Sequence, residues 1–532
     1  MDINGKATLI VTNANIWTGN PDQPRAEALA VIGAKILAVG NNKEITRLAA
    51  SETKIIDAHG QFITPGFNDS HLHFLAGGFN LAAVQLRAAD SKAEFIKRVS
   101  DYVKTLEPGT WLTGGDWDHT LWGGELPTRA WIDSVTPENP VWINRLDGHM
   151  ALANTLALQA AGIDANTADI EGGTIVRDSA GNPTGILKDN AMDPVNTVEP
   201  EAPDSLKFRA LEAAMDHVAQ QGVTSVQHMG TWDHLRIFET FHKKGLLRTR
   251  ISANVPLGTW ARLHKKVAQE GLGDEWLRYG GLKAFMDGSL GSHTAAFFEP
   301  FIDTPRDSGL LVNDPEELYS FIQSADEAGL QIMVHGIGDR AISILLDLFG
   351  RTIETNGIRD RRFRIEHSQH IHPKDFVRYR DLNVIASMQP YHCIDDGRWA
   401  EGYIGYERCK TTYAFRTLVD HDVKMAFGSD WYVAPPTPLE GIYAAVTRRT
   451  LDDKNPGGWI PHEKLTVEEA LRAYTIDAAY ASFEENIKGR LEAGKLADFV
   501  IIDRDLITIP PETIRDAQVV MTVVGGKVVF ER

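Results

Sequence analysis

Nine residues near the start of the chain, residues 65–73, read PGFNDSHLH and carry the pattern that decides the fold. In an extended strand successive side chains point to opposite faces, so His71 and His73 share one face while Leu72 points away. At the C-terminal end of a first barrel strand, both imidazoles would reach the mouth where α/β-barrel enzymes carry their active sites. Two imidazoles at this spacing suit zinc and similar metals. The stretch therefore predicts a metal site at the end of a barrel strand.

The middle of the chain continues with a strand–helix rhythm. Apolar runs that end in glycine, aspartate or histidine alternate with helical segments such as 208–221, 315–328 and 340–355. Nine runs qualify as strands, one more than a (β/α)₈ TIM barrel holds. We exclude the run at 141–146, because it lies in an interval without this rhythm. The eight predicted barrel strands are 67–73, 224–229, 250–255, 282–287, 331–335, 363–367, 384–389 and 424–430.

Two further regions flank or interrupt this α/β barrel. Residues 1–64 and 488–532 read as short strands separated by turns, and Gly525 with Gly526 marks a hairpin. We expect them to form one small β-sandwich domain from both termini. Residues 75–205, rich in tryptophan, glycine and turn signals, are predicted to be an insertion after the first barrel strand. The barrel domain as a whole is predicted to span residues 65–487.

Other predicted strands also end in polar residues. The fourth strand carries Lys283, the fifth ends at His335, the sixth at His367 and the eighth at Asp430. Each histidine alone could be a core residue, but strand ends that converge at one edge of a barrel indicate a shared site. A second HxH pattern at residues 370–372 precedes a proline and is interpreted as a loop, so we leave it out of this site.

Lys283 has two chemical interpretations. A charged, unpaired lysine inside an apolar strand is costly, so burial favours its neutral amine. A neutral amine can take up CO₂ to form a carbamate, whose two oxygens can bridge two cations. The alternative is an ordinary lysine paired with a carboxylate such as Asp287. The residues alone leave both interpretations open.

The amino-acid composition indicates which kinds of binding partner are disfavoured. The formal net charge is -18, which disfavours contact with nucleic acid or anionic lipid surfaces. Only two cysteines, Cys393 and Cys409, are present, which argues against a disulfide scaffold or a thiolate metal site. Neither an N-terminal signal pattern nor a long apolar run is found, so we expect a cytoplasmic protein with two reduced thiols.

Taken together, the motifs resemble the amidohydrolase superfamily and, within it, the YtcJ-like branch, amidohydrolase family 3. The resemblance covers nearly the whole chain and includes segments near its end, such as GRLEAGKLADFVIID. Its seven main ordered motifs are PGFNDSHLH (65–73), WINRLDGHMALAN (142–154), GGTIVRDSAGNPTGILKD (172–189), LKAFMDGSLGSHTA (282–295), VHGIGDRA (334–341), RIEHSQ (364–369) and GSDW (428–431).

This resemblance implies a site for two divalent metal ions, usually zinc. His71 and His73 would bind the more buried ion, and His335 and His367 the more exposed one. Lys283 would bridge both as a carbamate. Asp430 would contact the buried ion and carry a proton from the metal-activated hydroxide to the leaving nitrogen of an amide, N-acyl or N-formyl substrate. Lys188 is the rival for the carbamate, but it lies in the insertion.

Substrate contacts are expected mainly from the insertion and from loops above the strands. His149 could polarise the carbonyl or hold a substrate oxygen. Asp189 stands where relatives commonly have Glu, and His293 where they commonly have Arg, so both could tune the pocket. The candidate substrate-binding residues are Trp117, Trp122, Arg145, Asp147, Asp189, His293, Tyr391 and His392. Their aromatic content favours a small, apolar or aryl-bearing substrate.

Other functions stay open at this point. The same metal site would also serve an esterase, a lactonase, a ring deaminase or a non-hydrolytic enzyme such as a decarboxylase, because the pocket decides the reaction. A barrel that has lost catalysis and acts as a binding module is a further alternative, although every expected ligand position is present. The partner we expect is a small-molecule substrate; whether the chain forms a homodimer is left open.

Overall fold

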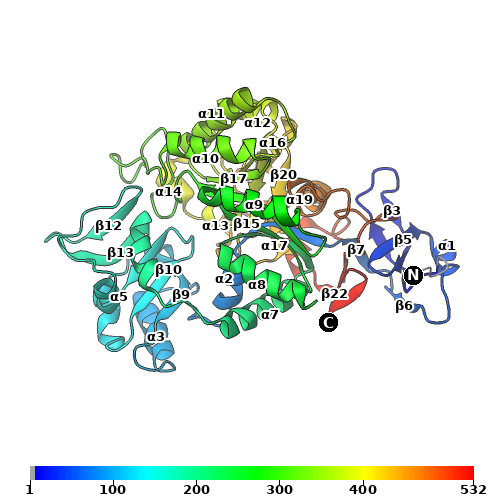
Figure 1. The fold of residues 1–532 in the computed structure, drawn as a ribbon, viewed down its shortest axis with the longest axis horizontal. Coiled ribbons are helices and arrows are strands. Elements are labelled where there is room, and N and C mark those ends of the chain that lie inside the picture. Colours follow the sequence, from blue (N-terminus) through cyan, green and yellow to red (C-terminus); the bar gives the residue numbers. More distant parts are fainter. Residues whose placement is uncertain (1–5) are drawn as a thin grey trace.

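The computed structural model describes residues 6–532, and its centre is a parallel barrel (Figure 1). Among the described residues, eight parallel strands form one sheet in sequence order, each strand hydrogen-bonded to the next. These strands are β8 (Phe67–Leu72), β14 (Val223–Met229), β15 (Arg250–Pro256), β16 (Leu277–Phe285), β17 (Gln331–Gly336), β18 (Arg364–His367), β19 (Ile385–Met388) and β20 (Met425–Phe427). All eight predicted barrel strands are thereby confirmed.

The first and last strands meet just beyond β20. The amide of Asp430 donates to the carbonyl of His71 at 2.7 Å, and the amide of Ser429 donates to the Asp69 carboxylate at 2.9 Å. These contacts bring the chain after β20 beside β8, at the carboxyl ends of both strands. Residues from opposite ends of the barrel sequence therefore meet in one place, as an eight-stranded barrel requires.

Helices cover the outside of the barrel because their apolar faces must be buried against the sheet. In α11, for example, Ile342, Leu345, Leu346 and Phe349 are buried at the spacing of one helix face. The principal helices around the barrel are α2 (Phe74–Asn80), α7 (Asp204–Gln220), α8 (Trp232–Lys243), α9 (Trp260–Glu270), α10 (Pro315–Glu327), α11 (Asp339–Asn356), α12 (Phe376–Asp381), α13 (Pro390–Asp396), α16 (Phe415–Asp420), α17 (Pro438–Thr447), α18 (Val467–Tyr474) and α19 (Ile476–Ala481).

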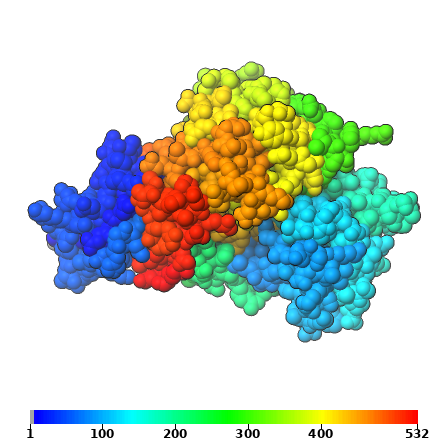
Figure 2. All heavy atoms as spheres, turned by 180° about the vertical axis from the view of Figure 1, so that it is seen from behind, coloured from blue at the N-terminus to red at the C-terminus, as the bar shows by residue number. Residues whose placement is uncertain are grey.

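Both termini contribute to a β-sandwich at one end of the molecule, as the sequence predicted. One sheet has the order β23-β22-β21-β7-β2-β3 and so combines N-terminal and C-terminal strands; the other has the order β5-β4-β1-β6. Figure 2 shows the C-terminal strands in red between the N-terminal strands in blue and the barrel. The strands are β1 (Leu9–Thr12), β2 (Asn15–Trp17), β3 (Arg25–Ala26), β4 (Ala28–Ile32), β5 (Lys35–Gly40), β6 (Lys54–Asp57), β7 (Phe62–Pro65), β21 (Phe499–Ile502), β22 (Val519–Val524) and β23 (Lys527–Glu531).

The insertion after β8 has its own sheet, in the order β12-β13-β11-β10-β9. Its strands alternate between two apolar cores: Ile143 of β10 packs with one cluster and its neighbour Trp142 with the other. The run excluded from the barrel is therefore an insertion strand, as predicted. The insertion strands are β9 (Leu112–Trp117), β10 (Val141–Arg145), β11 (Met150–Ala153), β12 (Gly173–Arg177) and β13 (Pro183–Asp189), with helices α3 (Lys92–Val103), α4 (Arg129–Ile132), α5 (Thr155–Ala160) and α6 (Asp193–Val198). The domain boundaries that we predicted stay predictions.

Candidate metal centre

The first part of the candidate metal centre joins the end of β8 to the segment after β20. Backbone hydrogen bonds lock the two segments together, including one of 2.6 Å from the His73 amide to the Trp431 carbonyl. Asp430 Oδ1 then lies 3.5 Å from Nε2 of His71 and 3.4 Å from Nε2 of His73. Ligands about 2.0–2.1 Å from one tetrahedral zinc ion are separated by roughly 3.3–3.4 Å. Each of the two imidazole nitrogens is therefore spaced from the Asp430 oxygen as two ligands of one ion would be.

Hydrogen bonds fix which nitrogen each of these imidazoles presents. Nδ1 of His71 lies 2.5 Å from Oε2 of Glu366, and Nδ1 of His73 lies 3.1 Å from the Met229 carbonyl. Both partners only accept hydrogen bonds, so each Nδ1 carries the proton and each Nε2 keeps its lone pair. A ligand histidine oriented by a carboxylate or carbonyl in this way is typical of metal sites.

Two more imidazoles lie beside this group. His335 Nε2 lies 2.9 Å from the Gly288 carbonyl, while its Nδ1 has no hydrogen-bond partner among the described residues. His367 Nδ1 lies 2.9 Å from Oε1 of Gln389. The His367 ring centroid is 4.5 Å from that of His335 and 4.9 Å from that of His71. His367 thus lies between His335 and the first group, and ligand atoms of His71, His367 and Asp430 all fall within 4.8 Å of one another.

The backbone is in the left-handed region at two of these positions. φ is 75° at His367 and 60° at Asp430, although neither residue is glycine. Such conformations cost energy and are concentrated at functional sites. At His367 the change of direction ends the strand alternation, so the side chains of Glu366 and His367 both contact or approach the His71 ring.

Burial keeps the imidazoles of His71, His335 and His367 neutral, which is the form that binds metals. It lowers the pKa of His71 to about 4, with a further contribution from Lys283. It also lowers the pKa values of His335 and His367 well below the ordinary value. For Asp430 burial acts in the raising direction, but the imidazoles of His73, His71 and His367 lower its pKa well below the usual range. The site therefore offers neutral nitrogens and one carboxylate.

Lys283 lies on β16 with its ammonium 4.4 Å from the Phe285 ring centroid. Burial lowers its pKa to about 8, although Glu366 and Asp430 act in the opposite direction. Within residues 6–532 its side chain makes neither a hydrogen bond nor an ion pair. Asp287, the alternative partner, instead accepts backbone amides of Ala296, Ile337 and Gly338 at 2.8–3.0 Å. Lys188 donates to the Ser292 carbonyl at 2.7 Å.

A cavity of about 160 Å³ opens over these residues. His73, Lys283, His335, His367 and Asp430 line one side. The rest of the wall comes from the insertion and from loops above the strands: Arg145, Leu146, Asp147, Gly148, His149, Phe285, Ser289, Leu290, Gly291, Ile337, Gln369, His392, Asp395, Asp396, Trp399, Tyr432 and Val433. The barrel and its insertion together therefore enclose the site.

The predicted substrate-binding residues divide between this cavity and other places. Arg145, Asp147, His149 and His392 line the cavity. Asp189 lies behind His149, with a carboxylate oxygen 2.7 Å from Nδ1 of His149. Burial lowers the pKa of His149, but the Asp189 carboxylate outweighs this effect, so the pKa is raised.

The remaining candidates are not among the cavity residues. Trp117 is fully buried and donates to the Ile143 carbonyl, and Trp122 packs against Phe95 and Trp131 in the same insertion core. His293 contacts Asp303 at 2.8 Å, and Tyr391 borders the main core. The structure does not bring these four side chains to the metal centre.

Several residues at the site were not singled out from the sequence: Glu366, Asp395, Asp396, Trp399 and Tyr432. Glu366 directly precedes His367 in the sequence. Arg364 lies two residues before Glu366, on the same face of the strand, and its Nε is 2.7 Å from a carboxylate oxygen of Glu366. Two opposite charges two residues apart on a buried strand were the available signal. Asp395 and Asp396 end helix α13, and Trp399 and Tyr432 lie in the irregular segments after α13 and β20, where spacing carries no such signal.

An eight-stranded α/β barrel with histidines and an aspartate converging at its mouth defines a hydrolase with a site for a divalent metal ion. The sequence pattern of the Amidohydrolase family matches residues 54–530, and the chain belongs to this family. Its members act as hydrolases on carbon–nitrogen bonds, which fits the metal centre above. Within residues 6–532 there is no helix both long and apolar enough to cross a membrane.

Relatives resemble the chain over nearly its whole length. It is 41% identical to Protein LONG AFTER FAR-RED 3 of Arabidopsis thaliana, over 98% of this chain and 92% of the relative. It is 30% identical to the putative amidohydrolase YtcJ of Bacillus subtilis (97% and 98%) and 27% identical to N-substituted formamide deformylase of Arthrobacter pascens (98% and 98%). An uncharacterized metal-dependent hydrolase from Pyrococcus horikoshii superposes with a TM-score of 0.76 at 29% identity, covering 94% of this chain and 99% of the other. These matches confirm the resemblance to the YtcJ-like branch.

Proposed function

We propose that the protein hydrolyses the carbon–nitrogen bond of a small N-formyl or N-acyl amine with two zinc ions. The observation that carries this proposal is the orientation of four imidazoles. His71, His73, His335 and His367 each give one ring nitrogen to a hydrogen-bond acceptor and leave the other free beside the cavity. His71 and His73 with Asp430 would hold one ion, and His335 with His367 the second. When bound, the metals supply an activated water and polarise the substrate carbonyl.

Lys283 would complete the site as a carbamate. It is buried and unpaired, and burial lowers its pKa to about 8, so the neutral amine is far more populated than in an ordinary lysine. The neutral nitrogen forms a bond to the carbon of CO₂ and releases one proton to solvent, and the product is an anion with two oxygens. That anion would neutralise part of the charge of two cations and bridge them. A plain ammonium at this place would repel both ions.

Two side chains would handle protons and charge during hydrolysis. A carbon–oxygen bond to the attacking water forms, the carbon–nitrogen bond breaks, and one proton must move from the water to the nitrogen. Asp430 would carry that proton, first as base and then as acid. His149, held through Nδ1 by Asp189, which raises its pKa, would in its protonated form donate from Nε2 to the substrate oxygen as negative charge develops there.

The size and lining of the cavity support a small substrate. A volume near 160 Å³ admits a ligand of about the size of benzene or slightly larger. Phe285, Trp399 and Tyr432 supply apolar surface to it. The relative named N-substituted formamide deformylase, similar over 98% of both chains, supports formamides as the first compounds to assay.

Metal removal tests this proposal. Dialysis against a strong chelator should abolish hydrolysis of N-formylbenzylamine and lower the melting temperature, because four imidazoles and Asp430 lose their ions. Zinc should restore both. Full turnover by the metal-free protein would refute the proposal. A panel that adds esters, lactones and aminopurines distinguishes amide hydrolysis from esterase, lactonase or deaminase activity.

Substitution of Lys283 tests the bridge. Lys283→Met keeps the length and apolar contacts of the side chain but cannot form a carbamate, so the metal content should fall from two ions per chain to one or none. Lys188→Met is the matched control, because Lys188 is half-buried and donates to a backbone carbonyl of the loop after β16; it should keep two ions. Elemental analysis measures the number of metal ions per chain in both variants. An unchanged metal content in Lys283→Met would exclude the bridging role.

A further inference from the structure

The last residue of helix α13, Asp396, presents a carboxylate to the wall of the cavity. Its Oδ2 accepts hydrogen bonds from the Tyr413 hydroxyl at 2.6 Å and from Nε2 of Gln369 at 2.5 Å. Both donor residues are buried. Gln369 lies two residues after His367, so the carboxylate is tied to the barrel strand that carries a candidate metal ligand. Asp396 is therefore held in a fixed position beside the substrate space.

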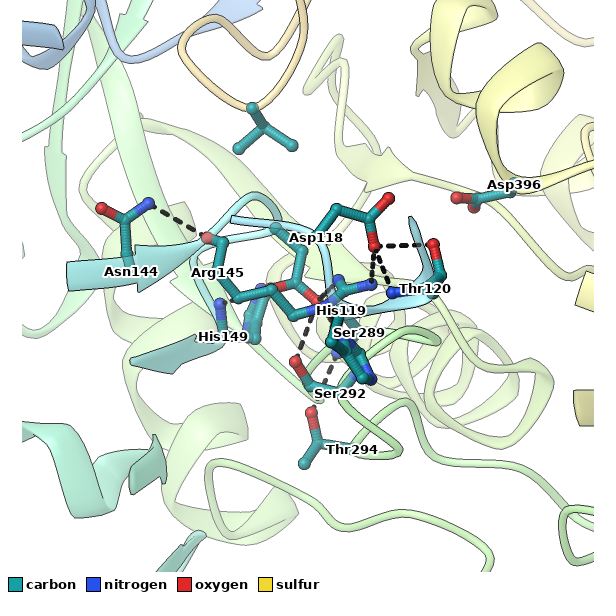
Figure 3. A network of polar contacts seen from close by, with 12 residues as sticks. Asp118, His119, Thr120, Asn144, Arg145, His149, Ser289, Ser292, Thr294 and Asp396 are labelled. Atoms are coloured by element: carbon teal, nitrogen blue, oxygen red, sulfur yellow. Dashed lines mark hydrogen bonds and ion pairs between the residues drawn. The ribbon is translucent and has the colours of Figure 1, made fainter. Parts of the chain in front are cut away.

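The second oxygen of this carboxylate, Oδ1, has no hydrogen-bond partner within residues 6–532. Unlike Nη2 of Arg145, it is not enclosed by protein atoms, and Asp396 lines the cavity. Figure 3 shows Asp396 extending toward the polar group around Arg145 and Asp118, with no dashed contact to any residue drawn. One acceptor atom of Asp396 is therefore open to a ligand in the cavity.

The ion pairs of the cavity wall distinguish Asp396 from its neighbours. Away from the metal centre, three of the described cavity residues carry carboxylates: Asp147, Asp395 and Asp396. Asp147 lies 2.6 Å from the guanidinium of Arg145, and Asp395 pairs with Arg398. Asp396 forms no ion pair with any residue in the described part of the chain. The carboxylate that is open to the cavity is thus the one without a cation.

Burial disfavours the ionised form of Asp396 as long as no cation lies beside it. It raises the pKa of this carboxyl group to about 7, although the Tyr413 hydroxyl lowers it. A cation at Oδ1 would favour the ionised form and would donate a charge-assisted hydrogen bond, which is stronger than a neutral one. A substrate carboxylate at the same place would be repelled. The missing partner is therefore best supplied by a positively charged donor.

We propose that Asp396 is a specificity-determining residue that binds a protonated amine at the end of the substrate remote from the scissile bond. The substrate class is then a diamine that carries a formyl or acyl group on one nitrogen, with a short spacer that suits a cavity of about 160 Å³. This inference rests on the proposed amide hydrolysis at the metal centre. It adds a second point of attachment, which orients the scissile bond.

Three formamides of equal length test the inference: N-(3-aminopropyl)formamide, N-(3-hydroxypropyl)formamide and N-butylformamide. They differ only in the terminal group, which is an ammonium, a hydroxyl or a methyl. At about pH 8 the amine is protonated and Asp396 is mainly ionised. With zinc-loaded protein we expect kcat/KM for the ammonium compound to exceed that for the butyl compound by about 10- to 100-fold, as for a hydrogen bond between charged groups. The hydroxyl compound should lie between them.

Substitution of Asp396 assigns the preference to this residue. Asp396→Asn keeps the size of the side chain and an acceptor for Tyr413 but removes the charge. It should reduce the preference for the ammonium over the butyl compound about tenfold or more, mainly through KM. Asp375→Asn is the matched control, because Asp375 is a fully buried carboxylate that accepts from the Ser343 hydroxyl outside the cavity; it should keep the preference. If Asp396→Asn does not fold, Asp396→Ser gives the same comparison.

Binding without turnover separates this inference from the proposed function. The mono-methanesulfonamide of 1,3-diaminopropane and the methanesulfonamide of butylamine resist hydrolysis, and calorimetry on the zinc-loaded protein measures their affinities. Tighter binding of the amino compound with no formamide hydrolysis would keep the inference and overturn the proposed reaction. Equal binding of the two with formamide hydrolysis would keep the reaction and overturn the inference. A preference that survives in Asp396→Asn would also overturn it.

Discussion

At the scale of single residues, acceptor groups behind the imidazoles determine what the metal centre can do. Glu366 is fully buried, lies 2.5 Å from Nδ1 of His71 and pairs with Arg364 at 2.7 Å. Arg364 in turn donates to the Ser70 carbonyl at 2.7 Å, next to His71 itself. The carboxylate thus both fixes the tautomer of a ligand and increases its basicity.

We predict that Glu366→Gln weakens zinc binding about 10- to 100-fold, since the amide can still accept from His71 but carries no charge. Competition with a chromophoric chelator measures the affinity. Glu463→Gln is the matched control: Glu463 is equally buried and bonds Thr417, in another part of the core. That variant should lose stability and keep its zinc affinity. Equal zinc affinity in both variants would mean that Glu366 has only a structural role.

Sequence reasoning reached the ligands themselves because each stands at the end of an apolar strand. His335 and His367 follow buried runs of β17 and β18, and barrel topology alone brings such ends together. Glu366 was passed over because period-two alternation places it on the opposite face from His367. The left-handed conformation at His367, which a sequence pattern does not reveal, turns both inward.

At the scale of elements, strands were predictable and the loops above them were not. Strands of a parallel barrel are buried on both sides and so read as apolar runs. The long segment between β16 and α10 has no such signal, yet it supplies Ser289, Leu290 and Gly291 to the cavity. The sequence favoured Trp117 and Trp122 as substrate contacts, but tryptophans in an insertion with its own core pack inside that core.

The prediction for the loops above the strands concerns Gly291. A Cβ in Gly291→Ala would meet the guanidinium of Arg145 at 2.4–2.6 Å, so either the loop or Arg145 must move. Overpacking of this kind costs typically about 1–3 kcal/mol. We expect a lower melting temperature and a lower kcat/KM for N-formylbenzylamine, because Gly291 and Arg145 both line the cavity.

The matched control for that loop variant is Gly402→Ala, in helix α14 (Ala400–Ile404). A Cβ at Gly402 has open space around it, and alanine is the better helix former. This variant should keep or slightly raise the melting temperature and leave kcat/KM for N-formylbenzylamine unchanged. If Gly291→Ala behaves like Gly402→Ala in both measurements, the loop does not seat Arg145.

At the scale of the whole molecule, the β-sandwich is fastened to the barrel beneath the metal centre. Arg250 at the start of β15 pairs with Asp498, just before β21, through contacts of 2.6 and 3.0 Å, and both side chains are buried. Asp498 also accepts the Gly525 amide at 2.7 Å, and its carbonyl accepts the amide of Gly66, the residue before β8. The C-terminal strands therefore hold the strand that carries His71.

Breaking this pair should destabilise the entire protein. Arg250→Met leaves the Asp498 carboxylate buried without its cation, and loss of one partner of a buried pair costs about 3–5 kcal/mol. We expect a clear fall in the melting temperature at a fixed scan rate, and a partial recovery in the double variant Arg250→Met, Asp498→Leu, in which no charge is left unpaired. Arg351→Met, which removes the exposed pair with Glu316, should leave the melting temperature nearly unchanged. A fall as small in Arg250→Met as in Arg351→Met would show that this ion pair does not stabilise the junction of the sandwich and the barrel.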